Sequence, residues 1–181
     1  MTPDEALAQK GPTDGFLCPL SANTYGLDFL EFEIKDYDSG ESIFHVKKDP
    51  EAGLPMLPDD IDPEIEKAVR TVKYTFPEKF LRFKTVRTAL VFSVGPEPVP
   101  NFRMIERHYF KGDLIRSYDF NFGFCIPGST NSWEAIYGVP EMTEKRIMDL
   151  TDSPFEMQSD SFYYVGDTLV MHNKAAYSYQ G

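Results

Sequence analysis

The segment Asn101–Phe110, NFRMIERHYF, brings a carboxylate and an imidazole within two residues of each other. In a β-strand, Glu106 and His108 point to the same face as Met104. If that face is buried, both polar groups must be hydrogen-bonded or paired, because an unsatisfied buried charge is costly. Such a pair can receive the polar head of a ligand, with Glu106 accepting an amide proton beside an apolar chain.

The same segment allows two other interpretations. Glu106 and His108 would be solvated if the opposite face pointed into the core, and the alternation does not decide between the two faces. That opposite face consists of Arg103, Ile105, Arg107 and Tyr109. An enzyme could use Glu106 and His108 as acid and base, but it would need a third polar group to orient His108, and the sequence offers no obvious one.

Motifs for other chemistry are missing from the sequence. The three histidines, His45, His108 and His172, do not stand in an H-E-x-x-H or similar metal spacing. There is no G-x-S-x-G elbow, no G-x-x-x-x-G-K-[ST] phosphate loop and no G-x-G-x-x-G turn. We therefore expect a protein that is not an enzyme, with no catalytic residues, no metal site and no cofactor.

Composition narrows the classes of partner. The chain has 181 residues, one ordinary domain, with 18 Lys and Arg against 29 Asp and Glu, so its net charge is -11. Nucleic acids and anionic membrane surfaces both require a basic footprint, so neither is an expected partner. No stretch is long and apolar enough to span a membrane, and the N-terminus lacks the pattern of a signal peptide. We expect a cytoplasmic protein in which Cys18 and Cys125 are reduced.

The elements that must position Glu106 and His108 are mostly strands. Nine or so short strands separated by turns predict a β-sandwich. The turn Asp36–Gly40 predicts a hairpin. The segments with strand patterns are Leu27–Ile34, Ser42–Val46, Thr71–Phe76, Phe80–Phe83, Thr88–Val94, Phe102–Phe110, Leu114–Cys125, Ser161–Val165, Leu169–His172 and Ala176–Tyr179.

Helices and loops make up the rest. Pro63–Val69 predicts a short helix with Asp62 as its cap, and Thr143–Leu150 predicts another. The proline-rich stretches Asp49–Pro63 and Gly95–Pro100 predict loops.

Two aromatic stripes raise the question of a filled or a hollow core. Phe120, Phe122 and Phe124 share one face of a strand, and Val72, Tyr74 and Phe76 share a face of another. Such stripes belong to a core more often than to a ligand wall. A plain interaction module with a filled sandwich is therefore a further alternative, because the pattern does not distinguish the two.

Three longer segments resemble the lipid-binding chaperones of the uncoordinated-119 homologue family, which is related to the delta subunit of rod phosphodiesterase. They are NFRMIERHYF (Asn101–Phe110), DFNFGFCIPGSTNSWE (Asp119–Glu134) and QSDSFYYVGDTLVMHNKAAYSY (Gln158–Tyr179). The resemblance implies an all-β fold, an immunoglobulin-like β-sandwich with an apolar lipid channel between the sheets and a few short helices. With it we expect a flexible N-terminal segment, residues 1–13, and one lipid-binding domain, residues 14–181.

The resemblance also implies a function and partners. Members of the family bind the N-terminal myristoyl group of client proteins, solubilise the clients and deliver them to membranes such as that of the cilium. A GTP-bound Arf-like small GTPase triggers release. The implied clients are N-myristoylated proteins, including G protein alpha subunits and ciliary proteins. We expect a monomer in the cytoplasm, associated with the cilium or centrosome, with no stable membrane insertion and no nucleic-acid partner.

Site residues follow from the same resemblance. Family positions that match Tyr74, Glu106, His108 and Tyr163 lie around the acyl-glycine end of the cargo. The positions that line the apolar channel match Phe32, Val72, Phe80, Met104, Phe120 and Phe122.

Acyl and prenyl cargo remain alternatives at this point. The prenyl-binding sibling shares the stretch FGFCIPGSTN, Phe122–Asn131, so that stretch does not discriminate. The segments IERHYF and QSDSFYYV resemble the acyl-binding branch. The alternative function is a prenyl-binding solubilising factor for farnesylated or geranylgeranylated proteins.

Overall fold

The computed structural model describes residues 1–54 and 56–181 of the chain. The described strands are β1 (Asp28–Asp36), β2 (Ser42–Lys47), β3 (Thr71–Thr75), β4 (Thr85–Ser93), β5 (Val99–Phe110), β6 (Asp113–Cys125), β7 (Thr130–Gly138), β8 (Met157–Val165) and β9 (Thr168–Ser178). The described helices are α1 (Pro3–Leu7), α2 (Pro63–Arg70) and α3 (Glu144–Asp152), with short 3-10 helices η1 (Leu20–Ala22), η2 (Pro50–Ala52) and η3 (Glu78–Arg82).

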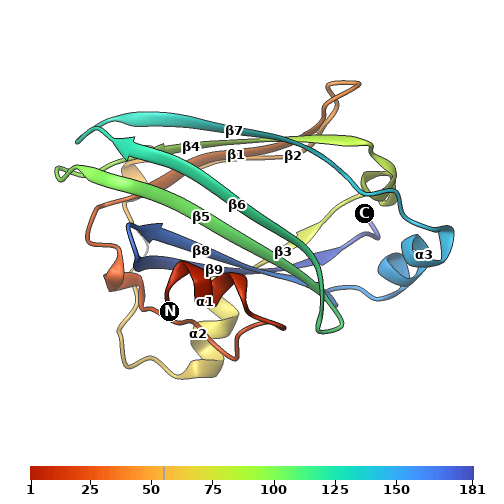
Figure 1. Ribbon diagram of the computed structural model, residues 1–181, viewed down its shortest axis with the longest axis horizontal. Coiled ribbons are helices and arrows are strands. Elements are labelled where there is room, and N and C mark those ends of the chain that lie inside the picture. Colours follow the sequence, from red (N-terminus) through yellow and green to blue (C-terminus); the bar gives the residue numbers. More distant parts are fainter. Residues whose placement is uncertain (55) are drawn as a thin grey trace.

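The strands form two sheets that pack face to face (Figure 1). The four-stranded sheet has the order β2-β1-β4-β7, and the five-stranded sheet has the order β3-β9-β8-β5-β6. Neighbouring strands are antiparallel except β3 and β9, which run parallel. This arrangement confirms the predicted β-sandwich with a few short helices.

Strands β5 and β6 pair as a hairpin through a two-residue turn. Lys111 and Gly112 both have positive φ angles, 50° and 88°. Two central residues with positive φ match the twist of the flanking strands, and such turns favour glycine. The turn fixes the register in which His108 lies opposite Arg116 and Met104 lies opposite Phe120. Side chains on this hairpin therefore form cross-strand rows.

The hydrophobic core is divided between the two ends of the sandwich. One cluster packs around Phe92, Phe102 and Cys125, where β4 and β6 end and β5 begins. The other packs around Val86 and Leu150, where β4 begins and α3 packs at the end of the sandwich (Figure 1). The middle of the sandwich lies between these two clusters.

Several predicted elements need correction. Phe80–Phe83 was predicted as a strand but belongs largely to η3, because Pro77 starts a helical turn in which the Phe80 N–H donates to the Pro77 carbonyl at 3.0 Å. The two segments predicted at Leu169–His172 and Ala176–Tyr179 form one strand, β9. The pattern did not predict β7 or α1.

The N-terminal residues lie against the outer face of the five-stranded sheet, the face that points away from the other sheet (Figure 1). Ala6 of α1 is fully buried against Ile105 and Phe162. The Tyr164 hydroxyl donates to the Thr2 carbonyl at 3.1 Å. The sequence predicted flexibility for residues 1–13; the structure gives this segment a packed position, and its mobility stays a prediction.

Candidate functional site

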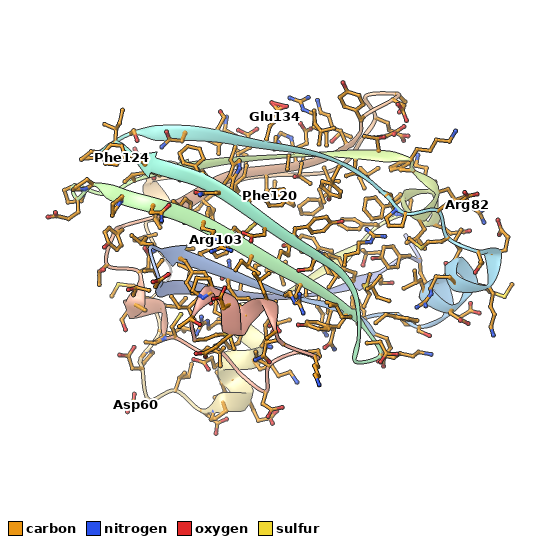
Figure 2. The ribbon with its side chains drawn as sticks, viewed as in Figure 1. Asp60, Arg82, Arg103, Phe120, Phe124 and Glu134 are labelled. Carbon is orange, nitrogen blue, oxygen red and sulfur yellow. The ribbon has the colours of Figure 1, made fainter. Side chains whose placement is uncertain are left out.

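A cavity of about 400 Å³ lies between the two sheets. Its mostly apolar wall includes Leu90 and Trp133 from the four-stranded sheet and Met104 and Phe120 from the five-stranded sheet. Figure 2 shows Phe120 in the space between the sheets, whereas Glu134 of β7 lies on the outer surface. Small-molecule sites commonly have volumes of roughly 300–1,000 Å³, so this cavity has the size of a ligand site.

The structure brings most of the predicted site residues together. Nine of the ten line the cavity: Phe32, Val72, Tyr74, Phe80, Met104, Glu106, His108, Phe120 and Tyr163. Phe122 is the exception, because its ring packs against Phe92 at 5.2 Å and Trp133 at 5.4 Å in the cluster at one end of the sandwich. Contact between these side chains and a lipid stays a prediction.

Glu106 and His108 form the polar centre of the cavity wall. His108 Nε2 lies 3.1 Å from Glu106 Oε2, and the Ser161 hydroxyl donates to Glu106 Oε1 at 2.8 Å. The two side chains keep 26% and 15% of their surface exposed, respectively. Burial raises the pKa of Glu106, but the hydrogen bond and electrostatic attraction of His108, followed by the hydrogen bond from Ser161, outweigh burial, so this pKa lies below its usual value. An ionised Glu106 can accept a further N–H donor from a ligand.

Tyrosine hydroxyls surround this pair. The Tyr177 ring stacks on His108 at 5.7 Å and on Tyr74 at 5.5 Å, and its hydroxyl lies 2.9 Å from the Ser159 hydroxyl. Burial, followed by the charge of Glu106, raises the pKa of Tyr74, Tyr163 and Tyr177. These hydroxyls therefore stay protonated and can donate hydrogen bonds inside the cavity.

The structure settles which face of β5 points inward, and it buries both faces. Glu106 and His108 face the cavity with Met104. The interpretation that placed the opposite face in the core between the sheets is wrong, but that face is not solvated. Its residues Ile105, Arg107 and Tyr109 are buried on the outer side of the sheet. Arg107 is held there by a hydrogen bond from its guanidinium to the Gln9 carbonyl at 2.6 Å.

The outer face carries a second acid–histidine pair. His172 Nε2 lies 2.9 Å from Asp160 Oδ1, and both side chains are almost completely buried. The Leu17 N–H donates to His172 Nδ1 at 3.0 Å, so Nε2 carries the proton of a neutral ring and donates it to Asp160. Thr13 N–H and Lys174 Nζ also donate to Asp160, at 3.0 and 2.8 Å. The protein itself satisfies this pair, which has no surface facing the cavity.

Sequence reasoning missed several residues of the cavity wall. Arg116 and Tyr118 of β6 line the cavity together with the predicted Phe120. Period-2 alternation places both on the same face as Phe120, but their polar groups do not carry the apolar signal of a core-facing stripe. Trp133 was missed because β7 itself was not predicted.

The cavity wall extends to β2 and β3, each of which is an edge strand of its own sheet. Val46 of β2 and Val72 of β3 line the cavity and are about half exposed, at 50% and 47%. A second hollow of about 650 Å³ shares Phe29, Lys48 and Asn173 with the cavity wall. A ligand in the cavity could therefore continue outward into this hollow.

Other kinds of site have little support in the described part of the chain. Within residues 1–54 and 56–181, no cluster of three or more His, Cys, Asp or Glu side chains is arranged to hold a metal ion. No helix in the same residues is long and apolar enough to cross a membrane.

Comparisons with known proteins identify the family of the chain. Residues 21–179 match the sequence model of the family described as GMP-PDE, delta subunit. The chain is 44% identical over 181 residues to protein unc-119 homolog B of Danio rerio, covering 100% of this chain and 74% of that protein. It is 45% identical over 179 residues to protein unc-119 of Caenorhabditis elegans, covering 99% and 80%. For protein unc-119 homolog B of Homo sapiens the identity is 42% over 186 residues, covering 99% and 72%.

Proposed function

Because the chain belongs to the unc-119 family, within the wider GMP-PDE delta subunit family, we propose that it is a carrier for N-terminally myristoylated proteins. The family supports a lipid-binding solubilising protein. In the finer proposal, the acyl chain enters the cavity between the sheets, and the carrier performs no chemical step. The client is kept away from water until it is delivered to a membrane.

The observation that carries this proposal is the cavity itself. A sandwich whose two ends are packed could also close its middle, yet this one keeps about 400 Å³ lined by Phe, Leu, Met and Trp side chains. About 12 methylenes at about 0.8 kcal/mol each gain on the order of 10 kcal/mol when buried. One myristoyl chain holds a protein on a membrane only weakly and reversibly, so such a cavity can compete with a bilayer.

Recognition of the acyl amide would fall to the polar centre of the wall. In this proposal Glu106 accepts the amide N–H of the acylated glycine, and the hydroxyls of Tyr74 and Tyr163 donate to carbonyl oxygens. The acyl chain would then extend past Met104 toward Trp133. Free hydrocarbon lacks these polar partners, so the arrangement would favour an acylated peptide.

Release is proposed to need a second partner, because tight burial makes dissociation slow. A GTP-bound Arf-like small GTPase would bind an exposed sheet edge, a contact that edge strands such as β2 and β3 offer. A coupling of roughly 1–3 kcal/mol between the two sites would weaken cargo binding about 5- to 150-fold. The proposed clients are G protein alpha subunits and ciliary proteins, handled by a cytoplasmic monomer that associates with the cilium or centrosome.

The test is fluorescence polarisation with a labelled peptide that carries an N-terminal myristoyl-glycine. The same peptide without the acyl group, and one with a C-terminal farnesyl group, serve as comparisons. We expect sub-micromolar binding of the myristoylated peptide alone. Stronger binding of the farnesylated peptide would move the protein to the prenyl-binding alternative, and binding of neither would contradict a lipid carrier.

Release is measured on the preformed complex. Adding an Arf-like GTPase loaded with a non-hydrolysable GTP analogue should accelerate loss of polarisation, while the GDP-loaded form should not. Equal rates with both forms would remove GTPase-driven release from the proposal but leave lipid binding intact.

A further inference from the structure

Arg116 is a charged member of the cavity wall for which the proposed function has no role. It lies on β6 opposite His108 and faces the cavity. Three cross-strand rows follow one another along this wall: His108 with Arg116, Glu106 with Tyr118, and Met104 with Phe120. The wall thus changes from a cationic row to an apolar one over about 13 Å, four residues at roughly 3.3 Å each.

No carboxylate neutralises Arg116 within the described residues. No Asp or Glu oxygen of that part lies within 4.0 Å of its guanidinium, and its buried Nε has no hydrogen-bond partner there. The carboxylate one row away, Glu106, already accepts from His108 and Ser161. A guanidinium that is partly removed from water without a carboxylate partner is costly, so an anion supplied by a ligand would stabilise it.

The groups around Arg116 also favour an anion. Tyr118, Tyr137 and Tyr179 line the same part of the cavity. Burial raises the pKa of all three, so their hydroxyls stay protonated and can donate hydrogen bonds. A planar guanidinium among hydroxyl donors matches the two oxygens of a carboxylate.

We propose that Arg116 is the carboxylate-binding group of this cavity, an inference that rests on the proposed acyl binding. Two sources can supply the carboxylate. A free long-chain fatty acid would place its head at Arg116 and its tail along the Glu106 and Met104 rows toward Trp133. An acylated client would instead bring an acidic side chain from its first residues, since Arg116 lies one row beyond the proposed amide position. In either case the affinity of the cavity depends on the negative charge of the ligand as well as on the length of its acyl chain.

The test compares ligand pairs that differ only in charge. To test the free fatty acid, myristate and its uncharged methyl ester each compete against a labelled myristoylated peptide. Two myristoylated peptides that differ by Glu or Gln near the N-terminus examine the acidic side chain. For at least one pair we expect the charged ligand to bind about tenfold or more tightly to the wild-type protein.

Variants then test whether Arg116 causes the preference for the charged ligand. Arg116→Gln should remove the preference while the methyl ester and the Gln peptide bind as before, and Arg116→Lys should retain part of it. Arg146→Gln removes the same charge from the exposed face of α3 and should leave the preference unchanged. Equal binding within both pairs to the wild-type protein overturns the proposal, as does a preference that survives in Arg116→Gln. Failure of every acyl ligand would instead reject the proposed function.

Discussion

The two faces of the five-stranded sheet each carry an acid–histidine pair, and the two pairs differ in the groups that surround them. On the outer face, Asp160 and His172 are buried to within about 1% and receive hydrogen bonds from Thr13 and Leu17 of the N-terminal segment. On the inner face, Glu106 and His108 keep part of their surface exposed, facing the cavity. The N-terminal segment thus covers the outer pair, and the inner pair stays accessible to a ligand in the cavity.

This difference separates a structural pair from a binding pair. Both are short contacts between an acid and a histidine, at 2.9 Å in the outer pair and 3.1 Å in the inner pair, so distance alone does not distinguish them. What distinguishes them is burial and the neighbouring groups. Backbone N–H groups of the N-terminal segment bind both members of the outer pair, and only His172 reaches the 650 Å³ hollow, whereas both members of the inner pair line the apolar cavity. Changes to the outer pair should therefore affect folding, and changes to the inner pair should affect ligand binding.

The largest effect is expected from Asp160→Ala. Removing one partner of a buried ion pair leaves Lys174 without its carboxylate, and such changes cost about 3–5 kcal/mol of unfolding free energy. Urea denaturation measures the loss, with Asp149→Ala on exposed α3 as the matched control. A loss below about 1 kcal/mol would show that the outer pair is not structural.

Glu106→Ala tests the inner pair. We expect affinity for a myristoylated peptide to fall about tenfold or more, because hydrogen bonds to a charged group contribute about 1.5–3 kcal/mol. The unfolding free energy should change much less than in Asp160→Ala. Glu97→Ala, in an exposed loop, controls for the loss of charge. If Glu106→Ala loses stability while its folded form binds the peptide as tightly as the wild-type protein does, Glu106 is a structural residue.

Ala135→Leu tests the space beside the inner pair. Ala135 of β7 lines the cavity, so a larger side chain should obstruct the acyl chain at a cost of about 1–3 kcal/mol in binding. Stability should hold or increase, because the new side chain fills space. Titrations with acyl chains of decreasing length should show a smaller penalty for shorter chains. Ser132→Leu, on the outward side of the same strand, should change neither affinity nor chain-length preference.

The smallest expected effect is the pH dependence of stability that His172 of the outer pair produces. Burial lowers the pKa of His172 in the folded protein, so as pH falls the histidine is protonated in the unfolded chain before it is protonated in the folded one. The contribution to stability is therefore complete above about pH 6.5, the unfolded value, and is lost as pH falls toward the lower folded value.

One proton limits this slope to about 1.4 kcal/mol per pH unit. Denaturation midpoints between pH 7 and pH 5 should fall in the wild-type protein and fall less in His172→Gln. His45→Gln, at an exposed histidine, should retain the wild-type slope. Identical slopes in the wild-type protein and His172→Gln would show that His172 does not set the pH response.

Strong alternation made much of the fold predictable. Strands β1, β5 and β6 carry period-2 patterns that tertiary packing reinforces, and they lie close to where the pattern predicts them. The failures have local causes. Phe80–Phe83 has strand composition, but Pro77 directs it into a helical turn. Strand β7 alternates Trp133 and Ala135 with outward Glu134, yet its small and polar residues weaken the apolar signal.

The site was predictable only in part, because periodicity gives the face of a residue but not the volume beside it. Phe120 and Phe122 lie on the same strand and alternate identically, yet Phe120 lines the cavity while Phe122 packs against Phe92. The inward face of β5 could not be chosen from the pattern because the N-terminal segment buries the other face as well. Arg116 follows the same alternation, but a charged residue on a strand is usually solvated, so the pattern does not predict it in a cavity wall.

The most direct test of the central claim uses Trp133, the single tryptophan of the chain, which lines the cavity. A peptide whose N-terminal acyl chain carries bromine near its end is titrated while tryptophan emission is recorded. Bromine quenches only at short range, so we predict saturable quenching with the acylated peptide and none with an unacylated brominated peptide. Tight binding without quenching would place the acyl chain outside the space between the sheets and contradict this account.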